Sequence, residues 1–133
     1  MQQSNAETAP ALAPDCRAGT PGSIDRSFLD AIRSLESEDD PGIVRELITI
    51  YLEDSTSRMA DIKQTVLDGD STRIRRAAHG LKGSSANVGA TGLAALCAEL
   101  EHLPPGASGS QLLQKIEVEF RSVRTELELE RDR

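Results

Sequence analysis

Apolar residues recur every three or four positions along five stretches of this 133-residue chain, the spacing of one face of an amphipathic α-helix. The expected helices cover residues 24–36, 41 to about 68, 71 to between 87 and 89, 91–103, and 110 onward. No stretch shows the period-two alternation of a β-strand. The pattern predicts an all-α fold: an antiparallel four-helix bundle built from the four later segments, with an additional short N-terminal helix.

Each expected helix has an aliphatic face that is predicted to point inward. The first would start at an N-cap, Ser23, and bury Ile24, Phe28, Ile32 and Leu35. The inward residues of the later helices are Val44, Leu47, Ile48, Tyr51, Ser55, Met59, Ile62, Val66, then Ile74, Ala77, Ala78, Leu81, Ser85, Val88, then Leu93, Leu96, Cys97, Leu100, Leu103, and finally Leu112, Leu113, Ile116, Phe120, Val123 and Leu127.

Turn and cap residues set the expected boundaries. Pro41 would open the second helix, which should continue through the polar stretch 54–57 and end at a left-handed Gly69. Asp70 or Ser71 would cap the third helix and Thr91 the fourth. The run of Pro, Gly and Ser at 104–110 predicts a loop. The charged residues 126–133 are expected to fray into solvent.

Residues 1–22 are rich in Ala, Pro, Thr, Ser and Gly and hold few bulky apolar side chains. Such a segment cannot bury enough surface to offset the entropy of ordering, so it is expected to be a disordered tail or linker. The predicted domain is therefore a single helical bundle over residues 23–133.

The charge balance excludes several classes of protein. With 15 basic and 22 acidic residues the chain has a net charge of −7, which argues against nucleic acid as the main partner. No apolar run is long enough to cross a membrane, and no secretion signal is visible at the N-terminus. Cys16 and Cys97 are expected to remain free thiols, and the cytoplasm is the expected location.

The segment 71–90 has an unusual polar face. At 100° per residue, His79 lies about 160° from Leu81, the centre of the apolar stripe, and so should point into solvent. Arg75, Arg76 and Lys82 surround it, and the segment has four basic residues and no acidic ones. The rest of the chain has 11 basic and 22 acidic residues, so this face concentrates positive charge that favours an anion.

The chemistry that suits this face is phosphoryl transfer. A histidine with an ordinary pKa of about 6.5 is mostly neutral at cytosolic pH and is then a nucleophile. Phosphoryl transfer needs mainly positioning and charge stabilisation, and Lys82, one turn from His79, supplies a cation. Gly80 and Gly83 each cost about 1 kcal/mol within a helix and therefore call for a reason. Gly83, beside the imidazole, leaves room for a partner protein.

The nine residues from Ala77 to Ser85 read Ala-Ala-His-Gly-Leu-Lys-Gly-Ser-Ser and are followed by Val-Gly-Ala. This motif resembles the signature of histidine-containing phosphotransfer (HPt) domains, and the resemblance extends over about residues 24–127. It implies a four-helix bundle that exchanges a phosphoryl group with receiver-domain aspartates in a two-component multistep phosphorelay. His79 would be the phosphoacceptor, Lys82 the phosphate-stabilising cation and Gly83 the clearance residue for the receiver.

The expected partners are a response-regulator receiver domain and a hybrid sensor histidine kinase, contacted through Arg75, Arg76, Ala78 and Ala86. The chain is expected to be a monomer. It is not expected to be an enzyme, because no nucleotide-binding or autokinase module is visible. No cofactor or metal is expected on it, and Mg²⁺ is expected on the partner receiver domain only. Some HPt members place a neutral amide opposite the histidine, whereas this chain has Glu99 and Glu101 in that region.

Two other functions are compatible with parts of this pattern. An HPt-like adaptor could bind a receiver or kinase without carrying phosphate, although it would not need His79, Lys82 and Gly83 together. A chemotaxis-type kinase has a phosphoaccepting domain with a similar motif, but no kinase module follows here. A Ser/His hydrolase is disfavoured because His79 lies on a different face of the helix from Ser84 and Ser85, and the sequence has no elbow turn. His102, at the end of a helix, is expected to act as a cap.

Overall fold

Five helices follow one another in residues 23–132, the part of the chain that the computed structural model describes. They are α1 (Arg26–Arg33), α2 (Ile43–Asp68), α3 (Ser71–Ala86), α4 (Thr91–Glu101) and α5 (Ser110–Arg131). No strand occurs within this part. The tail expected at residues 1–22 lies outside the described residues.

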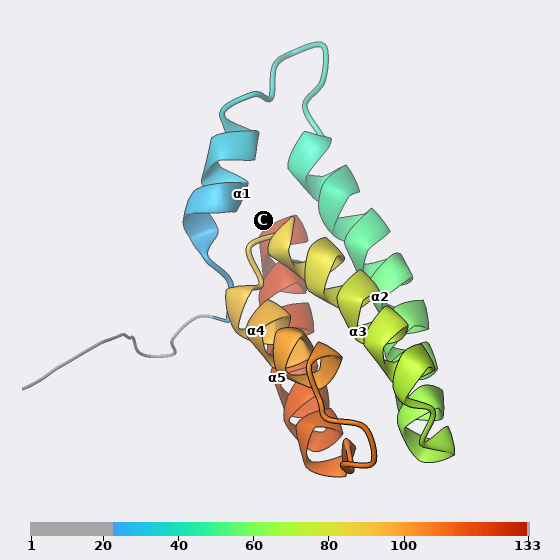
Figure 1. The fold of residues 1–133 in the computed structure, drawn as a ribbon. Helices are drawn as coiled ribbons and strands as arrows, with labels where there is room; N and C mark the ends of the chain where they lie inside the picture. The colour runs from blue at the N-terminus through green and yellow to red at the C-terminus, as the bar shows by residue number, and fades with distance from the viewer. Residues whose placement is uncertain (1–22, 133) are drawn as a thin grey trace, which may run out of the picture.

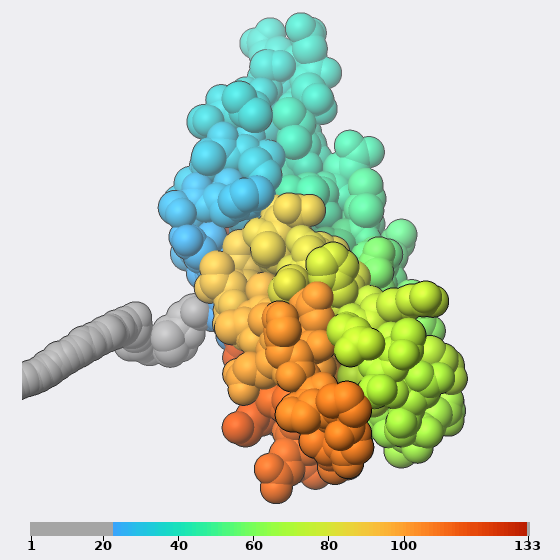
Figure 2. Space-filling view, viewed as in Figure 1, coloured from blue at the N-terminus to red at the C-terminus, as the bar shows by residue number. Residues whose placement is uncertain are grey.

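Helices α2 to α5 form an antiparallel bundle in which each helix packs against two neighbours (Figure 1). The α3 helix lies between α2 and α4, and α5 closes the ring against the same two helices. The short α1 packs beside α2. In the view of Figure 2, α3 and α4 form the front face side by side. The predicted four-helix bundle with an additional N-terminal helix is confirmed, and α3 and α5 lie diagonally across it.

The core consists almost entirely of the aliphatic residues that the sequence pattern places inward. Its largest fully buried side chains are Leu29, Val44, Ile48, Ile62, Leu81, Val88, Leu93, Cys97, Leu100, Ile116, Val123 and Leu127. One polar pair lies among them: the hydroxyl groups of Tyr51 and Ser85 are 2.9 Å apart and both buried. Ser85 therefore points inward, as predicted, and joins α3 to α2 by a hydrogen bond.

The prediction was wrong in detail for α1. The helix begins after Asp25, whose carboxylate accepts a hydrogen bond from Ser27 N–H, so Asp25 and not Ser23 is the N-cap. The helix ends at Arg33, which leaves Leu35 beyond it and 70% exposed. Leu29 is buried where Phe28 was expected, and the Phe28 side chain lies at the surface.

Two other helix starts also differ from the prediction. The α2 helix begins at Ile43 with Gly42 as N-cap, so Pro41 precedes the helix. Thr91 is the first residue of α4, and Ala90 occupies the cap position without a side-chain hydrogen bond. The predicted boundary between α2 and α3 is confirmed: Gly69 has a φ of 70°, and Asp70 accepts a hydrogen bond from Arg73 N–H.

The end of α5 does not fray into solvent, contrary to the prediction. Glu130 is buried and forms ion pairs with Arg26 and Arg33, with its Oε2 lying 3.1 Å from Arg33 Nη2. Glu126 accepts a hydrogen bond from Ser23 N–H at 2.6 Å. The acidic residues that were expected to be solvated therefore attach α1, and the residue Ser23 before it, to α5.

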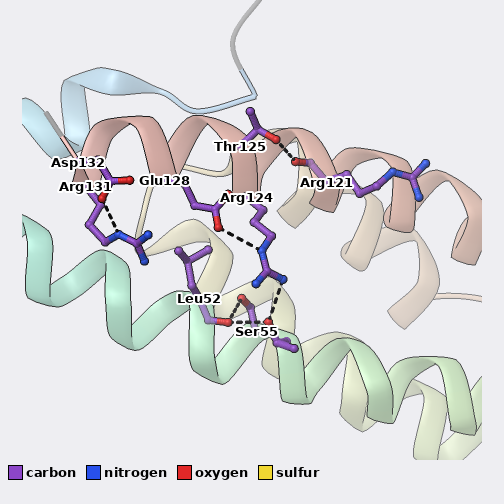
Figure 3. A network of polar contacts seen from close by, with 9 residues as sticks. Leu52, Ser55, Arg121, Arg124, Thr125, Glu128, Arg131 and Asp132 are labelled. Atoms are coloured by element: carbon purple, nitrogen blue, oxygen red, sulfur yellow. Dashed lines mark hydrogen bonds and ion pairs between the residues drawn. The ribbon is translucent and has the colours of Figure 1, made fainter.

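A further polar contact joins α5 to α2 (Figure 3). The Arg124 guanidinium lies 3.5 Å from Glu128 Oε2 on its own helix and 3.5 Å from Thr56 Oγ1 on α2. Thr56 in turn donates to the Leu52 carbonyl at 2.7 Å. The α2 helix runs unbroken through this polar stretch, as predicted, and the hydroxyls of Ser55 and Thr56 are satisfied by the Leu52 carbonyl of the preceding turn.

Candidate functional site

His79 lies in the middle of α3 with 69% of its side chain exposed. The opposite side of the helix is fixed in the core by Ile74, Ala78, Leu81 and Ser85. Because the helix is anchored along that stripe, the outward direction of the imidazole follows from the helical repeat. The predicted orientation of His79 is therefore confirmed.

The last residue of α4, Glu101, reaches across to two side chains of α3. Its Oε2 lies 2.8 Å from His79 Nδ1, and its Oε1 lies 2.6 Å from Lys82 Nζ. The Glu101 side chain is only 15% exposed. The Lys82 ammonium, and to a lesser extent the His79 ring, hold the pKa of the Glu101 carboxyl below its ordinary value against the opposing effect of burial.

This contact separates the two nitrogens of the imidazole. Nδ1 is occupied by Glu101, whereas no side chain among residues 23–132 hydrogen-bonds to Nε2. The ring is therefore exposed, and the contact between Glu101 and Nδ1 fixes its orientation. The Lys82 ammonium lies on the same side of α3 and shares the carboxylate with the ring.

The structure also decides between the two acidic residues that the sequence left open. Glu101 faces His79, whereas Glu99 is exposed on α4. Two positions along a helix correspond to a rotation of about 200°, so only one of the two can face α3. The sequence identified the helix but could not fix its rotation.

The two glycines that flank the motif have different surroundings. A side chain added at Gly83 would meet no atom within 4 Å, and this residue is exposed on α3. At Gly80 an added methyl group would overlap the Arg58 guanidinium, which reaches over from α2. Arg58 is held there by Asp54, one turn earlier, with an Nε–Oδ2 distance of 2.7 Å. The contact with Arg58 thus explains why residue 80 is a glycine. No contact within the described fold requires a glycine at residue 83.

Of the four residues expected to contact a partner, Arg75, Arg76 and Ala86 are exposed on α3. Ala78 is completely buried, so its inclusion among the contact residues was wrong. It belongs to the apolar stripe, one position before His79, and a 100° turn separates the two side chains. The sequence does not reveal the position of Arg58, although the glycine at position 80 indicates that another group lies close to the helix there.

The remaining candidates have structural roles. His102 is the C-cap of α4, and its Nδ1 lies 2.7 Å from the Ala98 carbonyl, which confirms the predicted capping. Cys97 is buried, and burial raises the pKa of its thiol to about 12, so it is not a nucleophile. Within residues 23–132, no cluster of three or more His, Cys, Asp or Glu could hold a metal. In the same range no helix is long and apolar enough to cross a membrane.

Comparisons with known proteins agree with this geometry. Residues 46–132 match the model of the Hpt domain family. The chain is 26% identical over 113 residues to histidine-containing phosphotransfer protein 2 of Arabidopsis thaliana, an alignment that covers 80% of this chain and 72% of that protein. It also resembles the crystal structure of histidine-containing phosphotransfer protein B (HptB) from Pseudomonas aeruginosa PAO1, with a TM-score of 0.68, 28% identity, and coverage of 83% of this chain and 95% of that one. The helical bundle, the motif around His79 and these matches together show that the chain belongs to the Hpt domain family.

Proposed function

We propose that this protein is a phosphocarrier of a two-component multistep phosphorelay, in which His79 Nε2 accepts a phosphoryl group from the aspartate of one receiver domain and passes it to another. One observation carries the assignment: the imidazole of His79 is largely exposed, its Nδ1 contacts Glu101, and no side chain of residues 23–132 hydrogen-bonds to its Nε2. An imidazole held in this way is a nucleophile that presents one defined atom. The names of the two relatives support the same chemistry.

The neighbours of His79 have separate roles in this proposal. Lys82 provides an ammonium that can turn from Glu101 toward the phosphoryl oxygens. Gly83 provides a surface without a side chain, on which the receiver can bring its aspartate close to Nε2. Arg75, Arg76 and Ala86 form the exposed contact surface around the histidine.

The partner supplies the rest of the reaction. A receiver domain would bring the acyl phosphate and the Mg²⁺, so the carrier itself needs no cofactor, nucleotide site or autokinase activity. A hybrid sensor histidine kinase would be the source of phosphate upstream. The protein would act as a monomer in the cytoplasm.

The test is transfer of a radiolabelled phosphoryl group from a receiver domain charged with labelled acetyl phosphate. The wild-type protein should acquire an acid-labile label, and the His79→Gln variant should fold normally but acquire none. The His102→Gln variant is a matched control, because it removes the other exposed histidine of the described bundle. Label retained on His79→Gln would contradict the assignment. Stable binding of the receiver without any transfer to wild type would indicate an adaptor instead.

A further inference from the structure

Arg58 of α2 brings unused hydrogen-bond donors close to His79. Its guanidinium lies over the backbone of Gly80, the next residue after His79 on α3, and a methyl group added at Gly80 would be 3.4 Å from its Cζ. Asp54 accepts a hydrogen bond from Arg58 Nε at 2.7 Å. Neither Nη1 nor Nη2 has a hydrogen-bond partner among residues 23–132. A guanidinium is a planar fork of N–H donors, so the donors on both Nη atoms remain available for a ligand.

The direction of the reactive nitrogen of His79 follows from its contact with Glu101. The two ring nitrogens of an imidazole point in nearly opposite directions, and Nδ1 points at Glu101 on α4. Nε2 therefore faces away from α4. Because α3 packs between α4 and α2, a phosphoryl group on Nε2 lies on the side of His79 toward α2.

The order of side chains around α3 agrees with this direction. Measured from Leu81 at 100° per residue, the exposed arc contains Lys82 at about 100°, His79 at about 160°, Gly83 at about 200° and Gly80 at about 260°. Lys82 borders the arc on the side of α4, where it contacts Glu101. Arg58 borders it on the side of α2, over Gly80. The histidine and the bare surface at Gly83 thus lie between two cations.

A phosphoryl group needs stabilisation on more than one side. It brings a charge of about −1.5 to −2 at neutral pH, and in the transition state this charge is spread over the oxygens around the phosphorus. The Lys82 ammonium lies on one side and is shared with Glu101 at 2.6 Å. On the other side, the Arg58 guanidinium can bind phosphate oxygens by two parallel hydrogen bonds. Its ion pair with Asp54 involves Nε and leaves both Nη atoms open.

We propose that Arg58 is a second phosphoryl-binding cation of this site, whose Nη groups donate hydrogen bonds to the phosphoryl oxygens during transfer. The proposal rests on the proposed function. In the accepting step the His79 Nε2 lone pair attacks the phosphorus, the N–P bond forms, and the P–O bond to the receiver aspartate breaks with its electron pair left on the carboxylate. Arg58 keeps its protons throughout and stabilises the oxygens that stay on the phosphorus.

This role also gives a reason for the glycine at residue 80. A glycine within a helix lowers the stability of that helix. The side chains of Arg58 and Asp54 are 41% and 43% exposed, and an ion pair as exposed as this contributes little to stability. Room for the ion pair alone would therefore not offset the cost of the glycine. Room for a guanidinium beside the phosphoryl group explains why Gly80 is kept free of a side chain.

The first test measures how fast the whole chain is loaded by phosphoramidate, a small phosphoryl donor that needs no partner protein and releases ammonia when its P–N bond breaks. Loading of His79 is followed by ³¹P NMR. Arg58→Ala should load about tenfold more slowly than wild type, or slower still. Arg58→Lys should recover part of the loss, because it keeps the charge but not the planar fork. Circular dichroism checks that each variant is folded.

Arg73→Ala is the matched control for this experiment. Arg73 is also an exposed arginine paired with an aspartate, Asp68, at a distance of 3.0 Å. It lies on α3 more than one helical turn before His79 and should not reach the phosphoryl group. The Arg73→Ala protein should therefore be loaded at the wild-type rate.

NMR of the arginine side chains detects the contact itself. When wild type is loaded, the guanidinium signals of Arg58 should shift and their protons should exchange more slowly with water, whereas those of Arg73 should stay unchanged. The His79→Gln variant should show neither effect. Equal loading rates for wild type and Arg58→Ala, with no shift of the Arg58 signals, would overturn the proposal.

Transfer from a charged receiver domain separates the remaining outcomes. If Arg58→Ala slowed this transfer but was loaded by phosphoramidate at the wild-type rate, Arg58 would contact the partner protein and not the phosphoryl group, and the proposal would be wrong. Label that persists on the His79→Gln variant would contradict the proposed function instead, because the phosphoryl group would then be carried by another residue.

Discussion

The Arg58 guanidinium lies across the backbone of Gly80, so that α2 reaches over α3 one residue after His79. Three residues farther along the same helix, nothing comes within 4 Å of the position that a Gly83 side chain would take. Gly80 and Gly83 look equivalent in the sequence but have different surroundings. Gly80 makes room for the Arg58 side chain, and Gly83 leaves the surface of α3 without a side chain.

Gly83→Ala should make the protein more stable and less active with its partner. A helical glycine costs about 1 kcal/mol relative to alanine, and the new methyl group meets nothing in the described fold, so urea unfolding should show a gain of about 0.5–1 kcal/mol. Transfer from a charged receiver should slow, while loading by phosphoramidate should keep the wild-type rate. Unchanged receiver transfer would show that Gly83 is not needed for docking.

Gly80→Ala is the matched comparison. The gain in the free energy of unfolding from replacing a helical glycine should be smaller here or absent, because the methyl group displaces Arg58 from its position beside Asp54. Combining Gly80→Ala with Arg58→Ala should restore the gain, since no guanidinium then needs to move. The comparison is made by urea unfolding of the single and double variants relative to Arg58→Ala. If Gly80→Ala alone raised the free energy of unfolding by the full amount, the position of Arg58 would not require a glycine at residue 80.

The Tyr51–Ser85 hydrogen bond should behave as a coupled buried pair. Either Tyr51→Phe or Ser85→Ala leaves the other hydroxyl buried without this partner, at a cost of about 1–3 kcal/mol in the free energy of unfolding. The double variant should lose less than the sum of the single losses, because no orphaned hydroxyl remains. A double-mutant cycle measures this coupling, and strict additivity would contradict it.

Stability should decline at alkaline pH. Burial raises the pKa of the Cys97 thiol from 9.0 to about 12 and that of the Tyr51 phenol from 10.0 to about 12. Both groups lose their protons more readily in the unfolded chain. Their effect on the free energy of unfolding is therefore constant below pH 9, and stability falls as pH rises from 9 toward 12. Each group contributes at most about 1.4 kcal/mol per pH unit. Urea unfolding at a series of pH values should show a shallower decline above pH 10 for Tyr51→Phe.

Glu130→Gln should loosen α1 without disturbing the site. The substitution removes the charge that holds Arg26 and Arg33, and hydrogen bonds to charged groups are worth about 1.5–3 kcal/mol. Amide hydrogen exchange in Arg26–Arg33 should accelerate, whereas α3 should keep its protection, because α5 and α3 lie diagonally across the bundle. Equal acceleration in both helices would show that α1 is part of the cooperative core.

The helices and their inward faces could be predicted because aliphatic spacing is a strong, local signal. The orientation of His79 followed from the same spacing once Leu81 was assigned to the core. The part of the candidate site that lies on one helix could be predicted, because His79, Lys82 and Gly83 all belong to α3. Arg75, Arg76 and Ala86 are exposed for the same reason, and Ala78 was misassigned although it belongs to the same buried stripe.

What the sequence could not give were the contacts between elements far apart in the chain. Glu101 could not be separated from Glu99, because the choice depends on how α4 is rotated against α3. Arg58 is 22 positions before Gly80, and only the packing of α2 on α3 brings them together. Glu130 looked like part of a solvated charged end, since its partners are in α1, about a hundred residues earlier.

The bare surface at Gly83 has a consequence for any attempt to improve this domain in the laboratory. A selection for heat resistance alone would favour side chains at this position, because filling it meets no obstacle in the described fold. If Gly83 gives the receiver its access to His79, as proposed above, such a library would accumulate proteins that are more stable but transfer phosphate poorly. Stability and phosphotransfer would then place opposite demands on the same position, one helical turn from the histidine.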